Sequence, residues 1–403
     1  MTRLDYNLDS RRHFLRAAIA VPPLLQKHIW GQSRSQASSQ YAESRSRMTL
    51  AKEWNSAYLW AVSPGGDLLC LYSSKDPLTT FTFRGEQRTS ERESPAQEVL
   101  AIVETTSWKS VFTNHLRARP SIVSFFADNQ TVYLETVVLP PDFRTGERVL
   151  IDLRAGKIEE RSYTRAPDEQ YTRYYALNGR ALLGIEADPN PSRAIALIRA
   201  SLPDYKVMAR AAYAMESVTP GDSATNNWGA VVSADRKVIA SRLGHTIVLR
   251  RTEDLGVIWT RQIEPEFFGV WRLAITPNGT RITAAVLDFI EKDRASNDYV
   301  SVYDGKSGKS LAKLPVSGKE GLAISPDGRL LAIAKKLAKN KDIQLFIEVY
   351  EATTGRHVTN CLHDTVRPGK YQNLVASIDG IEFTADGKYL MTSGNNTVKA
   401  WQV

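Results

Sequence analysis

The residues able to carry out chemistry are few and scattered along this chain of 403 residues. Its two cysteines are Cys70 and Cys361, and its six histidines never stand in a His-x-x-x-His or Cys-x-x-Cys arrangement. Zinc and haem sites can usually be recognised from ligand residues that stand close together in the sequence. No Gly-x-Ser-x-Gly elbow, Gly-rich phosphate loop or Asp-x-Asp-x-Asp-Gly calcium loop occurs either. The sequence therefore predicts no metal, no cofactor and no catalytic residue carried by a linear motif.

A site could still be assembled from residues that lie far apart in the chain. Glu320 and Asp379 each stand close to the start of an apolar segment, and together with His363 and Arg367 they make a conceivable site for hydrolysis or isomerisation. Four aromatic residues occupy similar positions: Tyr58, Tyr174, Trp228 and Trp271. Aromatic rings beside acids can stack on sugars or hold a cation, and the alternative is that they serve only as packing.

The elements that position these residues come from a sequence motif that recurs seven times. It reads as an apolar strand, a turn such as Ser325-Pro326-Asp327-Gly328, and a second apolar strand. Pro presets φ for such a turn, and Asp-Gly tolerates positive φ. Repeats of short strands spaced by roughly 40–60 residues indicate a β-propeller. We expect an all-β fold over residues 47–403, with seven four-stranded antiparallel blades. The copies are Ala61–Ser73, Val123–Glu135, Tyr174–Glu186, Val231–Leu243, Leu273–Val286, Leu322–Ala334 and Ile381–Ser393.

Each clear copy continues into a third strand that ends in an aromatic residue and a polar turn, as in Tyr303–Gly308 and Tyr350–Gly355 and, in part, at Trp401. With this four-strand order, residues 48–403 resemble the WD40 family, and especially its divergent bacterial members. The family's Gly-His pair and intact Trp-Asp dipeptide are absent, so we do not expect its buried Asp–His–Ser/Thr–Trp hydrogen-bond network. Seven-bladed relatives outside WD40, such as periplasmic lactonase-like propellers, are the alternative.

The two ends of the repeat region predict how the ring closes. The chain stops at Val403 after a third strand, and no fourth strand follows. Residues 47–52, Arg47 to Lys52, read as a strand just before the first repeat. We expect this strand to complete the last blade, because a closed ring leaves no open sheet edge. The alternative is that residues 43–52 are a disordered stub.

The N-terminus closely resembles a twin-arginine (Tat) export signal. The pattern runs from Ser10 through Arg11 and Arg12 to Arg16, which replaces the family's final Lys. A short apolar segment follows, and Ser35-Gln36-Ala37 offers a cleavage site. The resemblance implies that residues 1–37 are a targeting segment and 38–46 a linker, and that the protein is periplasmic or extracellular. The alternative, a basic tail, would leave it in the cytoplasm.

The charge balance argues against a nucleic-acid partner. The whole chain carries a net charge of +8, with 52 Lys and Arg against 44 Asp and Glu. Residues 1–37 hold six of the bases and two of the acids, which leaves 46 bases and 42 acids, or +4, in the rest. About half of the basicity therefore belongs to the signal-like segment. No run approaches the ~18 apolar residues of a transmembrane helix, so we expect no membrane span.

The long and irregular segments are predicted to lie on one face of the ring. They include 203–228, 335–342 and 363–377, whereas the turns on the other face are short. Long insertions on one face mark the binding face of a repeat protein. We therefore expect a non-catalytic protein-binding or scaffold module that meets a protein or an envelope component there; the alternative is a propeller enzyme with its site in the central channel. The residues assigned to the binding face are Tyr58, Tyr174, Trp228, Trp271, Lys335, Lys336, Arg367 and Tyr371, with the acids Glu320 and Asp379 at the channel mouth.

Overall fold

The structure, a computed structural model, describes residues 48–403 except 75–97, 117–119, 138–144, 165–171, 187–195, 203, 213–227, 244, 264–268, 288, 291–294, 297, 340–341 and 368–376. The chain divides into two units, Met1–Arg45 and Ser46–Val403, and every described residue belongs to the second. The regular elements among the described residues are strands, β1 to β30. Within the described residues, no helix has the length and apolar character needed to cross a membrane.

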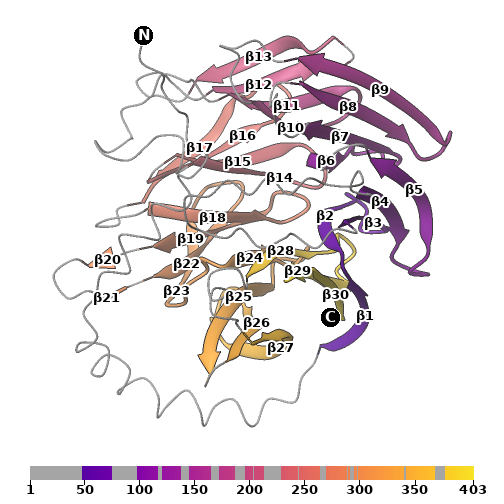
Figure 1. Ribbon diagram of the computed structural model, residues 1–403. Coiled ribbons are helices and arrows are strands. Elements are labelled where there is room, and N and C mark those ends of the chain that lie inside the picture. Colours follow the sequence, from indigo (N-terminus) through magenta and orange to yellow (C-terminus); the bar gives the residue numbers. More distant parts are fainter. Residues whose placement is uncertain are drawn as a thin grey trace, which may run out of the picture. The chain divides into compact units, whose positions relative to one another are not determined.

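Seven four-stranded antiparallel sheets make up a β-propeller, as predicted (Figure 1). In six of them the four strands follow one another in the chain, from the innermost strand to the outermost. The first three are blade 1, with β2 (Tyr58–Val62), β3 (Leu68–Ser74), β4 (Glu98–Glu104) and β5 (Ser110–Leu116); blade 2, with β6 (Pro120–Phe125), β7 (Thr131–Val137), β8 (Thr145–Asp152) and β9 (Lys157–Thr164); and blade 3, with β10 (Thr172–Ala176), β11 (Ala181–Glu186), β12 (Ala196–Ser201) and β13 (Lys206–Ala212).

The remaining blades have the same strand order, except that a hairpin is inserted in blade 5 and the fourth strand of blade 7 comes from the start of the described chain. They are blade 4, with β14 (Trp228–Val232), β15 (Val238–Leu243), β16 (Thr246–Arg251) and β17 (Val257–Gln262); blade 5, with β18 (Gly269–Ile275), β19 (Arg281–Leu287), β22 (Tyr299–Asp304) and β23 (Ser310–Leu314); blade 6, with β24 (Gly321–Ile324), β25 (Leu330–Lys339), β26 (Asp342–Glu351) and β27 (His357–Val366); and blade 7, with β28 (Ile378–Phe383), β29 (Tyr389–Gly394), β30 (Thr397–Gln402) and β1 (Thr49–Asn55). A small hairpin, β20 (Phe289–Ile290) and β21 (Ala295–Ser296), is inserted in blade 5.

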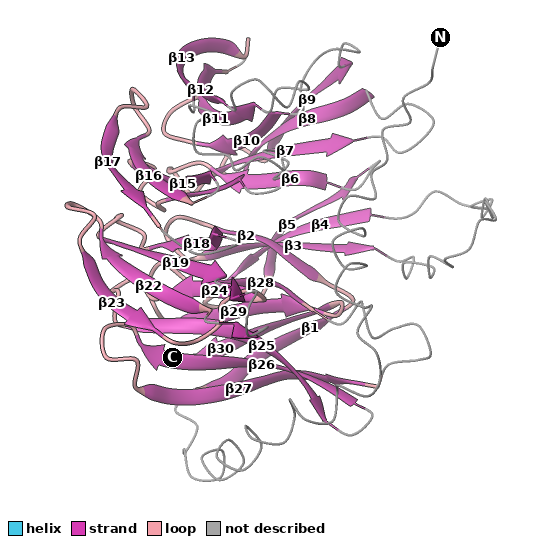
Figure 2. Ribbon diagram, turned by 90° about the vertical axis from the view of Figure 1, so that its left-hand side faces the viewer, coloured by secondary structure: helices cyan, strands magenta, loops and turns pink. Residues whose placement is uncertain are grey.

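The recurring sequence motif forms the turn between the first and second strands of each blade. In blade 6 the hydroxyl of Ser325 donates to Oδ1 of Asp327 at 2.6 Å and accepts the N–H of Leu330 at 2.8 Å. Gly328 has φ of +72°, a conformation that costs glycine little. Figure 2 shows the short turns gathered at one side of the blades. We call this side the short-turn face, and the opposite side the long-loop face.

The core is divided into seven hydrophobic clusters, and each one fills the seam between two neighbouring blades. The seam between blades 1 and 2, for example, buries Ile102 and Cys70 against Phe125. A seventh cluster joins blade 7 to blade 1, where Met391 and Val398 meet Leu69. Since a fully buried aliphatic side chain contributes about 1.5–3 kcal/mol, the seams hold the ring together.

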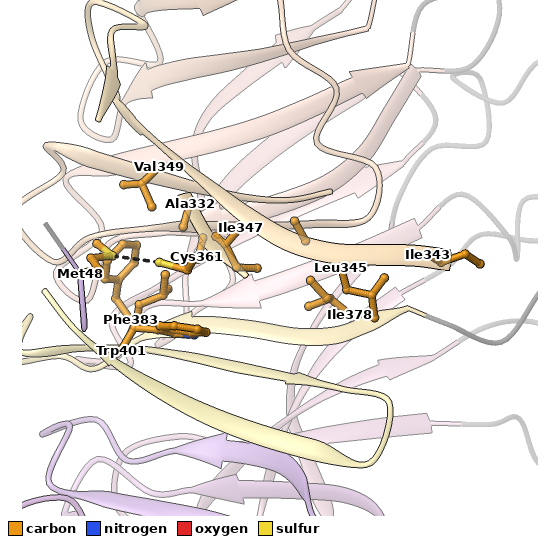
Figure 3. Close-up of a cluster of buried hydrophobic side chains, with 13 residues drawn as sticks. Met48, Ala332, Ile343, Leu345, Ile347, Val349, Cys361, Ile378, Phe383 and Trp401 are labelled. Atoms are coloured by element: carbon orange, nitrogen blue, oxygen red, sulfur yellow. Dashed lines mark hydrogen bonds between the residues drawn. The ribbon is translucent and has the colours of Figure 1, made fainter. Parts of the chain in front are cut away.

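The predicted closure of the ring is confirmed. Strand β1 pairs antiparallel with β30, from Thr49 opposite Gln402 to Asn55 opposite Thr397. Figure 1 shows these two strands side by side, although they come from opposite ends of the described chain. Met48 adds a sulfur contact of 3.8 Å to Cys361 in blade 6, as Figure 3 shows. Both cysteines are buried and free, and they lie in different blades.

Candidate functional site

The four aromatic residues predicted for the channel mouth all lie at or near the start of an innermost strand. Tyr58 and Trp228 open β2 and β14, and Tyr174 and Trp271 are the third residues of β10 and β18. Because each innermost strand runs from the long-loop face toward the short turns, these positions ring the mouth of the channel. The side chains of Tyr174 and Trp228, and the whole of Tyr371, lie outside the described residues.

Tyr58 closes the seam between the first and last blades. Its hydroxyl donates to Oδ1 of Asn396 in blade 7, and its ring centroid lies 6.0 Å from that of Tyr72. Next to it, the backbone N–H of Leu59 donates to Oγ of Ser393 at 3.1 Å. Tyr58 is therefore partly used in ring closure, and only part of its surface faces solvent.

Trp271 projects from the mouth beside two arginines. It is 39% exposed and is an extra residue in β18, between the pairs Val270–Val286 and Arg272–Ala285. Arg272 donates from Nε to the carbonyl of Lys319 at 2.8 Å, and Arg242 donates from Nη1 to the carbonyl of Val270. Burial, followed by the charge of Arg272, lowers the pKa of Arg242 to about 10. Arg242 stays charged at neutral pH, and it and Arg272 are both anchored to backbone carbonyls close to Trp271 in the chain or the fold.

The site built from Glu320, Asp379, His363 and Arg367 is not assembled. Glu320 is half-buried just before β24, and Asp379 is an extra residue in β28, with a side chain outside the described part. Arg367 lies on blade 6, where Nε bonds to Oδ1 of Asp342 at 3.2 Å. His363 was expected on a loop, but it lies in β27 with no exposed surface. A residue with no exposed surface cannot meet a substrate at the mouth.

His363 instead belongs to a buried hydrogen-bond chain between blades 6 and 7. Its Nδ1 is 2.9 Å from Oγ1 of Thr392, and its Nε2 is 3.1 Å from the carbonyl of Gly394. The indole N–H of Trp401 donates to the same Thr392 oxygen at 3.0 Å. Our expectation that no such network would be present was wrong for these three members. The signal was hidden because His363 is the extra residue of a β-bulge rather than part of a Gly-His pair.

Lys335 and Lys336 lie on strand β25 rather than on the loop predicted at 335–342. The ammonium of Lys335 is 3.7 Å from Oε2 of Glu348 and donates to the carbonyl of Ser317 at 3.1 Å. Tyr350 donates to the same Glu348 oxygen at 2.6 Å. Lys335 is thus fixed in a network at the seam with blade 5, whereas Lys336, the next residue, is exposed.

Blade 6 extends beyond the other blades at the long-loop face. As the structure describes them, its second to fourth strands, β25, β26 and β27, have ten residues each, whereas the second to fourth strands of blades 1 to 4 have six to eight. The pairing runs from Leu330 opposite Glu351 near the short turn to Lys339 opposite Asp342 at the far end. At about 3.3 Å per residue, the two to four additional residues add roughly 7–13 Å to the blade.

The two faces of this extension differ. On one face Ile343 and Leu345 are buried against Ile378 of blade 7, as Figure 3 shows. On the other face two cross-strand rows run over the three strands, Lys335–Phe346–Leu362 and Leu337–Gln344–Thr365. Leu337 is 43% exposed and Leu362 53%. We call this second surface the open face of blade 6; its two leucines are apolar groups in solvent, and the exposed Arg367 follows two residues after Thr365. Lys336 is the cross-strand partner of Leu345 and therefore belongs to the opposite face.

Sequence reasoning missed two charged residues inside the channel, Arg236 and Glu382. Arg236 lies in the first turn of blade 4, and Nη2 donates to the carbonyl of Phe125 in blade 2 at 2.7 Å. Glu382 lies on the innermost strand of blade 7, and burial raises its pKa to about 7 against the opposing effect of the Arg236 charge. Aligning the seven copies position by position would have revealed both, because each breaks the pattern of its position.

No group of three or more His, Cys, Asp or Glu that could hold a metal ion is found within the described ranges of blades 1 to 7. Comparison with protein-family models and with curated proteins gave no match.

Proposed function

We propose that this protein is a WD40-like, non-catalytic binding module that holds a protein partner on its long-loop face. The observation that carries the proposal is the open face of blade 6, where Leu337 and Leu362 lie in solvent on a regular sheet surface. The chain of hydrogen bonds from His363 through Thr392 to Trp401 supports the WD40-like assignment, because it joins the residue types of that family's network. The propeller supplies the rigid support that such a surface needs.

The partner expected at this surface presents apolar side chains flanked by carboxylates. Leu337 and Leu362 would be covered by the apolar groups, and the exposed Arg367 would face the acids. A paired charge at the rim mostly affects the association rate and its salt dependence, whereas the buried apolar contacts contribute more to affinity. Trp271 at the channel mouth would be a second contact for a larger partner.

Site-specific photo-crosslinking in cells tests this proposal. A photoreactive residue at position 337 or 362 should yield one crosslinked partner, whose contact peptide is then sequenced. Positions 207 and 257 are matched controls, because Val207 and Val257 are each 48% exposed on outer strands of other blades. The double variant Leu337→Asp, Leu362→Asp should lose the partner. Equal crosslinking from all four positions, or undiminished recovery by the double variant, would refute a specific contact at this face.

The proposal includes export by the twin-arginine route, and it rests on Arg11 and Arg12, which lie outside the described residues. This route carries folded proteins, and a ring whose last blade needs both ends of the propeller suits it. The variant Arg11→Lys, Arg12→Lys should fold normally and stay in the cytoplasm, and the exported form should begin near Ser38. Cell fractionation with N-terminal sequencing decides this; an uncleaved native protein in the cytosol would count against export.

The alternative is a propeller enzyme, and one observation favours a particular form of it. Glu382 has a pKa raised to about 7 inside the channel, which is suited to a general acid or base. Such an enzyme would use Glu382 rather than Glu320 or Asp379. A lactone and ester panel assayed with the native protein and with Glu382→Gln distinguishes the two readings, because only an enzyme would show turnover that the substitution abolishes.

A further inference from the structure

The third and fourth strands of blades 1 to 6 are joined by turns that each contain one residue of positive φ. Each of these turns also donates a backbone N–H to the first turn of its own blade, for example from Leu153 to the carbonyl of Gln130 at 2.8 Å. The turns are therefore equivalent and can be compared one by one. Their residues of positive φ are Trp108, Gly156, Tyr205, Leu255, Gly308 and Gly355.

In blades 1, 3 and 4 this residue has a large side chain, which packs on the preceding blade. The ring centroid of Trp108 lies 4.8 Å from that of Tyr389 in blade 7. The guanidinium of Arg148 in blade 2 lies 4.1 Å from the ring centroid of Tyr205. Leu255 is 2% exposed in the cluster that joins blades 3 and 4. Bulky residues seldom adopt positive φ, so the packing at the seam compensates for an unfavourable backbone.

In blades 5 and 6 the residue is glycine, and a side chain of the preceding blade fills the space beside it. A Cβ on Gly308 would lie 2.8 Å from the ring of Trp259 in blade 4. A Cβ on Gly355 would lie 3.4 Å from Cγ of Leu314 in blade 5. Among the described residues, five of the six turns are thus packed against the preceding blade by one large side chain, which comes from either side of the seam.

Blade 2 is the exception. Gly156 has φ of +63°, and no atom lies within 4 Å of the position that its Cβ would occupy. Strand β9 also pairs with β8 without the bulge that the outermost strands of blades 1, 3, 4, 5 and 6 have next to this turn. Two departures from the repeat therefore coincide where blade 2 meets blade 1.

The surface beside Gly156 is apolar. Phe112 and Leu153 are partly buried at the margin of the cluster between blades 1 and 2. Ile158 is 37% exposed and lies opposite Ile151, which is fully buried in that cluster, so Ile158 lies on the side of blade 2 that faces blade 1. We call the place bounded by Phe112, Leu153, Gly156 and Ile158 the open seam end.

Positive charges flank the open seam end on both blades. Lys109 follows Trp108 in the turn of blade 1, and Arg154 lies two residues before Gly156 in the turn of blade 2. Both side chains belong to exposed residues. Charges of one sign around an apolar contact favour a partner that carries the opposite sign.

We propose that the open seam end is a docking site for a segment of another protein, which inserts one leucine or aromatic side chain between blades 1 and 2. The chemistry of this side chain follows from the other seams, where tryptophan, tyrosine or leucine occupies the equivalent place. An acidic residue next to it in the segment would face Lys109 or Arg154. This surface is separate from the open face of blade 6 and does not depend on the function proposed for that face.

A random peptide library displayed on phage tests the proposal. Peptides are selected on the native protein and counter-selected on Gly156→Trp, which fills the open seam end from blade 2 as Trp108 does in blade 1. The selected sequences should share one leucine or aromatic residue with an acid nearby. In fluorescence anisotropy, Ile158→Asp should bind the synthetic consensus peptide about tenfold or more weakly than native. The double variant Lys109→Glu, Arg154→Glu should also bind more weakly, and most clearly at low salt.

Each variant has a matched control. Gly179→Trp changes a glycine with φ of +62° and no atom within 4 Å of its Cβ position, but in the first turn of blade 3, and should bind like native. Ile258→Asp changes an isoleucine that is 36% exposed at the second position of β17, as Ile158 is in β9, and should also bind like native. The double variant Leu337→Asp, Leu362→Asp should retain the peptide, which separates this site from blade 6.

Circular dichroism establishes that the variants are folded, and Ile158→Asp replaces Gly156→Trp in the counter-selection if the latter does not fold. The proposal is overturned if no peptide distinguishes the native protein from the counter-selected variant, or if the consensus has no large apolar residue. Equal loss of binding in Ile158→Asp and Ile258→Asp would overturn it too. So would a native oligomer that Gly156→Trp converts to a monomer, because a second copy of this chain would then be the occupant.

Discussion

The two faces of the ring are built in different ways, and the difference separates support from recognition. On the short-turn face every blade has a turn with one residue of positive φ between its first two strands. On the long-loop face the blades diverge, and blade 6 extends beyond the others. The uniform face closes the ring and holds the blades, so exceptions on it are informative. Two exceptions besides the open seam end are found there. Arg236 occupies the turn of blade 4, and in blade 7 the strands β30 and β1, from opposite ends of the described chain, pair without a turn between them.

The largest effect is expected from removing β1, the N-terminal strand that completes blade 7 without a connecting turn. Deletion of residues 1–55 takes away β1, which leaves the edge of β30 open and uncovers Trp401 and Cys361 next to Met48. An open edge beside an apolar surface favours association with other chains. We expect the protein to aggregate or to lose its cooperative thermal transition. Deletion of residues 1–37 is the control and should unfold like the native chain; a stable monomer without β1 would disprove the closure.

The next effect contrasts the two sides of the blade 6 extension. Leu345→Ala removes a leucine that is 1% exposed in the seam with blade 7 and should cost about 2–5 kcal/mol in unfolding free energy. Leu337→Ala, at a leucine 43% exposed on the open face, should change stability by less than about 0.5 kcal/mol. Urea denaturation measures both. If Leu337→Ala costs as much as Leu345→Ala, another part of the protein covers the open face.

A smaller effect is expected in the buried network between blades 6 and 7. Thr392→Val keeps the shape of the side chain but removes the oxygen that bonds both His363 and Trp401. Each buried polar group left unsatisfied costs about 1–3 kcal/mol, so the unfolding free energy should fall by about that amount or somewhat more. Thr365→Val, on the exposed part of β27, is the control and should be close to neutral. Equal stability of the two variants would show that the network does not stabilise the seam.

The sequence predicted what repeats and failed where one blade differs from the rest. Seven turns, four strands per blade and closure by the N-terminal strand follow from local patterns that recur, so each copy supports the others. The extension of blade 6 was taken for loops because 335–342 and 363–377 are polar at their centres, although cross-strand pairing continues to Lys339. His363, Arg236 and Glu382 escaped because their roles depend on which blades meet in space, and spacing along the chain does not show that.

The exceptional turn of blade 4 can be compared with the regular turn of blade 6 by opposite substitutions at the same turn position. Arg236→Gly relieves a positive φ and a desolvated charge, and its unfolding free energy should rise by roughly 0.5–1 kcal/mol. Gly328→Ala, at φ of +72°, should lower it by about 1 kcal/mol or more. Thermal unfolding of both variants provides the measurement. A loss of stability in Arg236→Gly would mean that the hydrogen bond from Arg236 to the carbonyl of Phe125 outweighs the strain of the turn.

The smallest effect concerns pH, and it again contrasts the two faces. Burial lowers the pKa of His363, near the long-loop face, below 6.5, whereas burial raises that of Glu382, near the short turns, from 4.5 to about 7. Below pH 6.5 the unfolded state binds a proton that buried His363 resists, so its contribution to stability is lost as pH falls. Between pH 4.5 and 7 folded Glu382 binds more protons than the unfolded chain, so its contribution is lost as pH rises.

The native protein should therefore show a shallow stability profile between pH 5 and 7, because the two slopes oppose each other. Glu382→Gln should leave the slope of His363, with stability increasing toward neutral pH; the neighbouring charges of Lys399, Asp364 and Glu53 tune it without changing its sign. His363→Gln should leave the slope of Glu382, with stability decreasing. Chemical denaturation at half-unit steps of pH gives all three profiles. Parallel profiles in the two variants would show that the two groups do not titrate in opposite directions.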